Sequence, residues 1–136
     1  MSRPSSHRLA AFTLTEMLVV LAIIGILVLI ALPNFTGVVG QTHAVEAQTA
    51  LKELHSLQKS YHYIHSKYSN ELSAIRFIQN KLESEGGNAK YRITIEEASA
   101  GTFVARATSV VDFNNNGTFN VWEINQDQQL VEVTPD

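Results

Sequence analysis

The most constraining feature of this sequence is an almost wholly apolar run from Phe12 to Leu32. A helix over this run would be ~31 Å long at a rise of ~1.5 Å per residue, close to the hydrocarbon thickness of a bilayer. Pro33 closes the run, and no comparable run follows it. The sequence therefore predicts a chain that crosses a membrane once.

Glu16 is the one acidic residue inside this run. A carboxylate costs roughly 2.5–3.5 kcal/mol at the centre of a membrane helix, and less near a helix end. Two interpretations follow. The carboxylate either lies at the level of the lipid headgroups, or pairs with a cation that arrives when another molecule packs against the helix.

The string from Phe12 to Met17 (FTLTEM), after a short basic leader, resembles the N-terminal processing signal of type IV pilins and pseudopilins. In that family a prepilin peptidase cleaves before the phenylalanine, and the new amino group is methylated. The resemblance implies cleavage between Ala11 and Phe12, methylation of Phe12, and pairing of Glu16 with the N-terminus of a neighbouring subunit. Ala11 stands where the family normally has glycine. Because alanine is the smallest replacement, we expect processing to persist.

Gly25 and Pro33 match the positions at which this family weakens its helix. Proline cannot donate a hydrogen bond to the preceding turn, and a helical glycine costs ~1 kcal/mol relative to alanine. A membrane glycine can also mark a close approach of two helices. Both interpretations suit a helix that packs in a bundle.

The charge distribution predicts the orientation of the chain in the membrane. The leader holds Arg3 and Arg8, whereas the first lysine after the apolar run is Lys52. The positive-inside rule then keeps the N-terminus cytoplasmic. A secretory signal peptide would have a shorter apolar core of roughly 7–15 residues. We therefore expect a single-pass inner-membrane precursor that is later assembled in an extracellular or cell-surface pilus.

The segment from Gly37 to about Ser66 has the period of an amphipathic helix. It would continue the membrane helix outward, to about 50 residues in all. Four histidines fall in or near it; a metal site is one interpretation, and a solvated face is the other. The predicted apolar stripe is Ala47, Ala50, Leu54, Leu57, Tyr61, Ile64 and Tyr68.

Alternating apolar residues after Lys90 predict an antiparallel meander, with strands at Tyr91–Ile95, Phe103–Ala107, Phe119–Ile124 and Gln129–Val133. The predicted fold is α+β: a long N-terminal helix packed on a small antiparallel sheet, as in type IV pilins. The expected parts are a cleaved leader (1–11), a transmembrane and polymerisation helix (12–33), its amphipathic continuation (34–68), a connecting αβ-loop (69–90) and a sheet with an Asp/Asn-rich loop (91–136).

The Asp/Asn-rich loop has the spacing of a calcium-binding loop. Asp112, Asn114, Asn116 and Glu123 occupy positions 1, 3, 5 and 12 of the twelve-residue pattern, with Gly117 at position 6. Oxygen ligands at these positions converge on a hard cation, so the pattern predicts a weak Ca²⁺ site. The alternative is an ordinary Asn-Gly hairpin turn.

The sequence contains no cysteine and no recognisable catalytic motif, which indicates a protein that is not an enzyme. Its net charge of −3 favours no specific nucleic-acid partner. The favoured function is a structural subunit of a type IV pilus that serves motility, adhesion or DNA uptake. The expected partners are further copies of itself in a helical filament, a prepilin peptidase, the membrane and inner-membrane assembly machinery. The alternatives are a minor pilin or type II secretion pseudopilin and, less favoured, a membrane-anchored binding protein that never polymerises.

Overall fold

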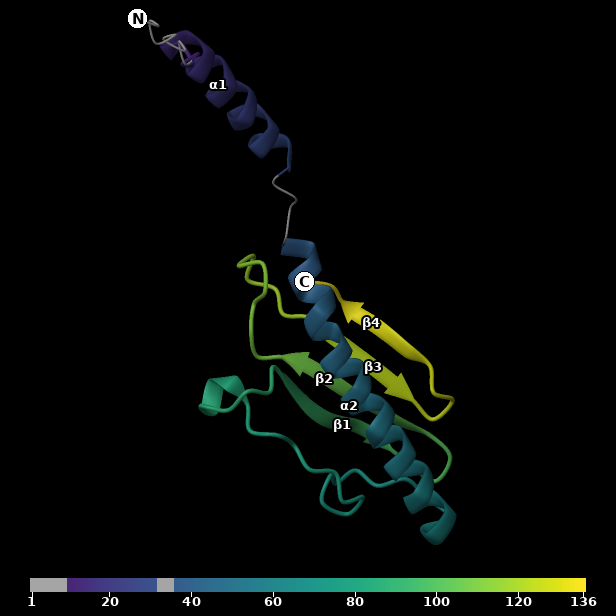
Figure 1. The fold of residues 1–136 in the computed structure, drawn as a ribbon. Coiled ribbons are helices and arrows are strands. Elements are labelled where there is room, and N and C mark those ends of the chain that lie inside the picture. Colours follow the sequence, from purple (N-terminus) through teal and green to yellow (C-terminus); the bar gives the residue numbers. More distant parts are fainter. Residues whose placement is uncertain (1–9, 32–35) are drawn as a thin grey trace, which may run out of the picture. The chain divides into compact units, whose positions relative to one another are not determined.

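The computed structural model describes residues 10–31 and 36–136 (Figure 1). The chain divides into two compact units, Met1–Asn34 and Phe35–Asp136. The first contains helix α1, Leu14–Ala31. The second contains helix α2 (Thr36–His65), a short 3₁₀ helix η1 (Glu83–Glu85) and four strands, β1 (Tyr91–Ala98), β2 (Phe103–Ser109), β3 (Val121–Asn125) and β4 (Leu130–Thr134).

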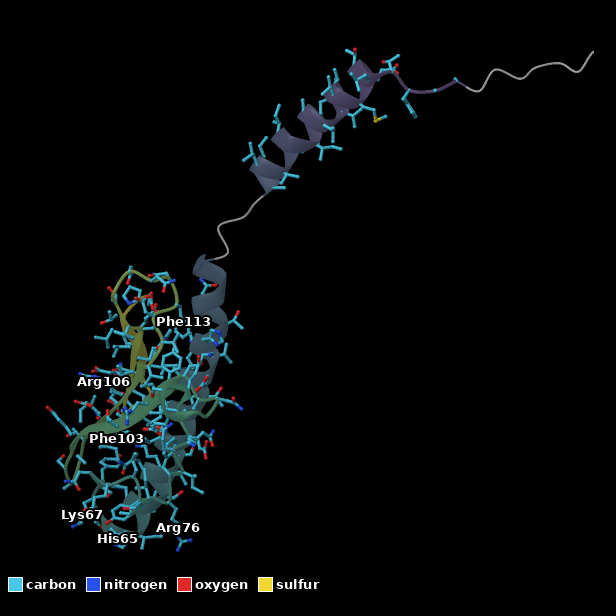
Figure 2. All side chains as sticks on the ribbon, turned by 90° about the vertical axis from the view of Figure 1, so that its left-hand side faces the viewer. His65, Lys67, Arg76, Phe103, Arg106 and Phe113 are labelled. Carbon is cyan, nitrogen blue, oxygen red and sulfur yellow. The ribbon has the colours of Figure 1, made fainter. Side chains whose placement is uncertain are left out.

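Helix α1 is apolar on every side, and none of its side chains is buried within the chain. Its mean hydropathy is 2.8 over Leu14–Ala31, and by length and composition it is the one described helix suited to crossing a membrane. Figure 2 shows its side chains pointing outward all round. A helix with no polar face has no preferred contact with a sheet, so its partner must be lipid or other apolar helices.

Helix α2 buries one face against β1, β2 and β3. This face differs in part from the predicted stripe: Leu51 and Gln58 are fully buried, whereas Ile64 is 77% exposed. Gln58 is inside because its amide pairs with the backbone of Ser69, donating to the carbonyl at 2.6 Å and accepting from the amide at 3.0 Å. A polar residue thus fixes the point where the chain folds back after α2.

The four strands form one antiparallel sheet in the order β1-β2-β3-β4 (Figure 1). Burial alternates along β2 as predicted, and Phe103, Ala105 and Ala107 are fully buried. The two alanines let α2 approach the middle of the sheet closely. The predicted α+β fold, a helix packed on a small antiparallel sheet, is confirmed. The continuity of α1 with α2 was also predicted, but the junction lies outside the described residues.

The connector between α2 and β1 covers the open edge of β1. The side-chain amide of Gln79 accepts from the backbone amide of Ile93 at 2.8 Å and donates to the carbonyl of Tyr91 at 3.1 Å. Gln79 therefore takes hydrogen bonds that a fifth strand would otherwise make. Further along, a Cβ on Gly87 would lie 2.0 Å from the carbonyl oxygen of Lys81, so only glycine fits this close crossing.

Candidate functional site

The predicted cleavage site lies in an exposed segment without regular structure. Ala11 and Phe12 both precede α1, and the side chain of Phe12 is 79% exposed. A peptide bond in exposed backbone outside a helix can enter the active site of a peptidase without helix unfolding. The predicted roles of Ala11 and Phe12 in cleavage and methylation remain predictions, and this geometry is compatible with them.

Glu16 forms a reciprocal capping box with Thr13 at the start of α1. The Thr13 backbone amide donates to Glu16 Oε2 at 2.7 Å, and the Glu16 backbone amide donates to Thr13 Oγ1 at 3.2 Å. Two of the amides that a helix start leaves without partners are thereby satisfied. The sequence pattern Thr-x-x-Glu before an apolar run is typical of this motif, which was not among the features predicted for Glu16.

Of the two predicted helix-weakening residues, Gly25 lies within α1 and Pro33 lies outside the described residues. Apart from its two chain neighbours and the backbone of its own helix, no described residue has an atom within 4 Å of the position a Cβ on Gly25 would take. Within this chain, Gly25 is therefore not required by a close contact. Its role in weakening or packing the helix stays a prediction.

The Asp/Asn-rich loop joins β2 to β3 and is held together by its own side chains. Asp112 accepts hydrogen bonds from the backbone amides of Asn116 and Gly117, at 3.2 and 2.7 Å. Asn114 Oδ1 also accepts from the amide of Asn116, at 3.0 Å, so these oxygens lie near one another. Within this loop, Asn115 (φ 58°) and Gly117 (φ 82°) have positive φ. Strand β2 ends at Ser109 and strand β3 begins at Val121, so neither strand reaches these two residues. Asn116 and Gly117 therefore lie within a longer loop and do not join the two strands by a tight two-residue turn.

Glu123, the fourth predicted calcium ligand, is paired elsewhere. It lies in β3 opposite Arg106 of β2, and its Oε1 accepts from Arg106 Nε at 2.8 Å and Nη2 at 2.6 Å. This hydrogen bonding raises the pKa of the Arg106 guanidinium. The structure thus brings the side-chain oxygens of Asp112 and Asn114 together at the Asn116 backbone amide. Asn116 Oδ1 instead accepts from the backbone amide of Thr118 at 2.6 Å, and the charge of Glu123 is already balanced. The described residues contain no group of three His, Asp or Glu side chains that could hold a metal ion.

The histidines of α2 do not gather into one site. His55 Nε2 lies 3.1 Å from the carbonyl oxygen of Gln126, and His62 Nε2 lies 2.9 Å from that of Ala100. His55 is buried, which differs from the predicted solvated face. Both histidines instead tie α2 to turns between strands of the sheet.

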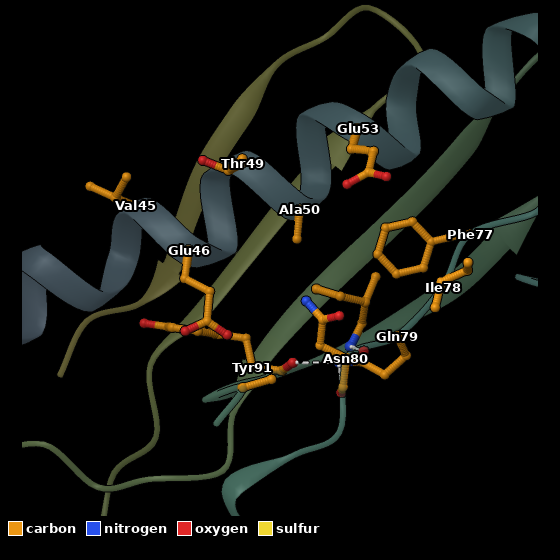
Figure 3. A pocket seen from close by; sticks show the side chains of 12 residues that line it. Val45, Glu46, Thr49, Ala50, Glu53, Phe77, Ile78, Gln79, Asn80 and Tyr91 are labelled. Carbon is orange, nitrogen blue, oxygen red and sulfur yellow. Dashed lines mark hydrogen bonds between the residues drawn. The ribbon is translucent and has the colours of Figure 1, made fainter. Parts of the chain in front are cut away.

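A cavity of about 290 Å³ lies between α2 and the connector, and Figure 3 shows side chains that line it. Glu46 and Glu53 extend into it from the helix, and Glu46 Oε1 accepts from the backbone amide of Lys90 at 2.8 Å. Tyr91 lies at its floor. Burial, with the nearby charges of Glu46, Glu132 and Asp136, raises the pKa of the Tyr91 hydroxyl, which therefore stays protonated. The residues lining this cavity include no nucleophile paired with a base.

Comparison with known families decides the identity. Residues 7–32 match the prokaryotic N-terminal methylation motif. Residues 33–119, more than half of the chain, match the family described as type IV minor pilin ComP, DNA uptake sequence receptor. This chain belongs to the type IV pilin family. The resemblance found in the first residues of the sequence is thereby confirmed, and it extends over most of the pilin domain.

Among curated proteins, this pilin is similar to the type IV major pilin protein PilA of Myxococcus xanthus (strain DK1622), with 39% identity over 90 residues. The match covers 66% of this chain and 38% of the relative, so it spans well under two thirds of the relative's length. The family is one of structural pilins and not of enzymes. The methylation motif and the apolar helix α1 together indicate membrane anchoring.

The calcium prediction is tested best by thermal unfolding of the full-length pilin in detergent micelles, in millimolar Ca²⁺ or in chelator. A cation bound only by the folded state adds about 1.4 kcal/mol at tenfold excess over Kd, or roughly 5 °C in Tm. We expect this rise for wild type and its loss in Asp112→Ala. Because Glu123 is bound to Arg106, Glu123→Gln should retain it. Equal Tm values for wild type in the two buffers would contradict a calcium site.

Proposed function

We propose that this pilin is a structural subunit of a type IV pilus fibre and has no catalytic role of its own. A prepilin peptidase cleaves it after Ala11, Phe12 is methylated, and inner-membrane machinery assembles copies of the chain through α1. The single observation that carries this proposal is Glu16, an acid on an otherwise apolar helix with no buried side chain. A simple membrane anchor needs neither this acid nor the processing motif.

The two comparisons differ on whether a similar protein is a major or a minor pilin. The family match is described as a minor pilin, whereas the similar curated protein is a major pilin. A type II secretion pseudopilin would use the same helix in a short fibre. We favour a type IV pilin, because both the matched family and the similar curated protein carry that description.

We also infer that the stretch from Gly25 to Pro33 loses regular helix when subunits leave the bilayer and pack. In lipid, each unpaired backbone group costs several kcal/mol, so the helix stays intact there. In a protein bundle, neighbouring side chains and water can satisfy the backbone groups that glycine and proline release. A helix that is weak at these two points can then bend to fit its neighbours.

The pairing of Glu16 with a neighbouring N-terminus predicts the result of Glu16→Ala. Removing one member of a desolvated ion pair typically costs roughly 3–5 kcal/mol, so fibre yield should fall by at least about a hundredfold. Synthesis and cleavage should continue, as judged by the amount of processed subunit in the membrane. Glu53→Ala is the matched control, because Glu53 is exposed and has no partner among the described residues. Normal fibre yield from Glu16→Ala would contradict the proposed pairing.

A second candidate function is DNA binding, which the description of the matched family names. One end of the pilin domain supports it. Figure 2 shows His65, Lys67 and Arg76 there, and neither Lys67 nor Arg76 has a charge partner among the described residues. The neighbouring Tyr63 is 85% exposed and could stack on a base. The local charge is positive although the net charge of the chain is −3.

The variant Lys67→Gln/Arg76→Gln tests this second function. If both side chains contact phosphates, affinity for duplex DNA falls and the slope of log K against log salt decreases by about 1 for each contact. Fluorescence anisotropy between 50 and 200 mM salt measures both quantities. Lys52→Gln/Lys81→Gln removes the same charge elsewhere and should change binding less. Equal losses from the two double variants, or no DNA binding by wild type, would contradict a site at this end.

A further inference from the structure

The capping box leaves one oxygen of Glu16 available. Glu16 Oε2 is engaged by the Thr13 amide, whereas Oε1 has no partner among the described residues. The hydroxyl of Thr13 completes the box by accepting from the Glu16 amide. The carboxylate is therefore fixed on the first turn of α1 with its second oxygen free.

We propose that Thr13 is a positioning residue for fibre assembly. Its hydroxyl caps the Glu16 backbone amide and so fixes the first turn of α1. In that turn the Thr13 backbone amide holds the Glu16 carboxylate in the conformation that receives the N-terminal ammonium group of a second copy. This inference rests on the proposed function. A glutamate side chain has several rotatable bonds, and ordering it costs up to ~2 kcal/mol of side-chain entropy. The box meets this cost within the subunit, so the cation of the next copy finds an acceptor already in place.

Processing keeps the capping box and creates its partner. Cleavage between Ala11 and Phe12 leaves both Thr13 and Glu16 in the mature chain, and the new amine is on the residue immediately before Thr13. Each mature copy thus carries a positioned acceptor and a free cation on the same helix end. A contact between one surface of a subunit and a different surface of the next repeats head to tail, and it builds a filament when its rotation does not close a ring.

The surroundings of Glu16 suit an ion pair shielded from water. A shallow concavity of about 380 Å³ lies beside the carboxylate, lined by Phe12, Thr15, Val19 and Val20. Apart from Glu16 itself and one hydroxyl, this lining is apolar. A charge pair that forms here in a packed fibre lies in a medium of low dielectric constant. There the attraction between the two charges offsets the cost of removing them from water only if their geometry is good.

The pair Thr13→Val and Thr13→Ser tests the inference. Valine keeps the shape of threonine and removes the hydroxyl, whereas serine keeps the hydroxyl and removes the methyl group. Losing an N-cap hydroxyl shifts a helix-start equilibrium about fivefold. We expect Thr13→Val to lower fibre yield about fivefold per cleaved subunit, and Thr13→Ser to stay within twofold of wild type.

Amide hydrogen exchange of the uncleaved full-length protein in micelles gives a second readout, which does not depend on processing. The Glu16 amide should exchange about fivefold faster in Thr13→Val and at the wild-type rate in Thr13→Ser. If the two variants behave alike in both measurements, the inference is wrong. A wild-type chain that forms no fibres would contradict the proposed function itself, and amide exchange would still decide whether Thr13 caps α1.

Discussion

The packing of α2 on β2 is the interaction on which the pilin domain depends. Leu51 and Leu54 of the helix and Ala105 and Ala107 of the strand are buried together in one core. Small residues on the strand let the helix lie close, and burial of the leucines supplies about 2 kcal/mol each. The strands β1 and β3 flank β2, so the whole sheet takes its position from this contact.

Polar side chains fix the ends of the helices and strands that the apolar core holds together. In this cysteine-free chain, the ends of the elements are fixed by hydrogen bonds from buried or partly buried amides and rings. Gln58 fixes the chain reversal after α2, Gln79 covers the edge of β1, and His55 holds the turn after β3. Each bond contributes only about 1 kcal/mol net, but a buried group left unpaired would cost more.

Helix α1 differs from the pilin domain, because it carries a single carboxylate in an apolar helix that has no buried side chain. This carboxylate needs hydrogen-bond donors and a countercharge where water is scarce. The capping box supplies one such donor within the subunit, because the Thr13 backbone amide donates a hydrogen bond to the Glu16 carboxylate. It leaves the negative charge itself unbalanced. We propose that a cation from a second copy balances it, which would link the chemistry of this one residue to assembly.

The sequence predicted the features that depend on local pattern. The apolar run became α1, and the alternation along Phe103–Ala107 became β2. Features that depend on distant partners were missed. Spacing alone placed Glu123 in a calcium loop, whereas the register of β2 and β3 sets it opposite Arg106. Gln58 was not expected in the core. The apolar period of the helix does not show that the chain folds back after α2 and places the Ser69 backbone beside the Gln58 side chain.

The central claim is that this chain is cleaved, methylated and built into a fibre. Mass spectrometry of the N-terminal peptide from purified, sheared surface fibres tests all three steps in one sample. The account predicts abundant pilin in these fibres, beginning at Phe12 with a methylated amino group. Fibre protein that begins at Met1, or at Phe12 without the methyl group, would contradict the account.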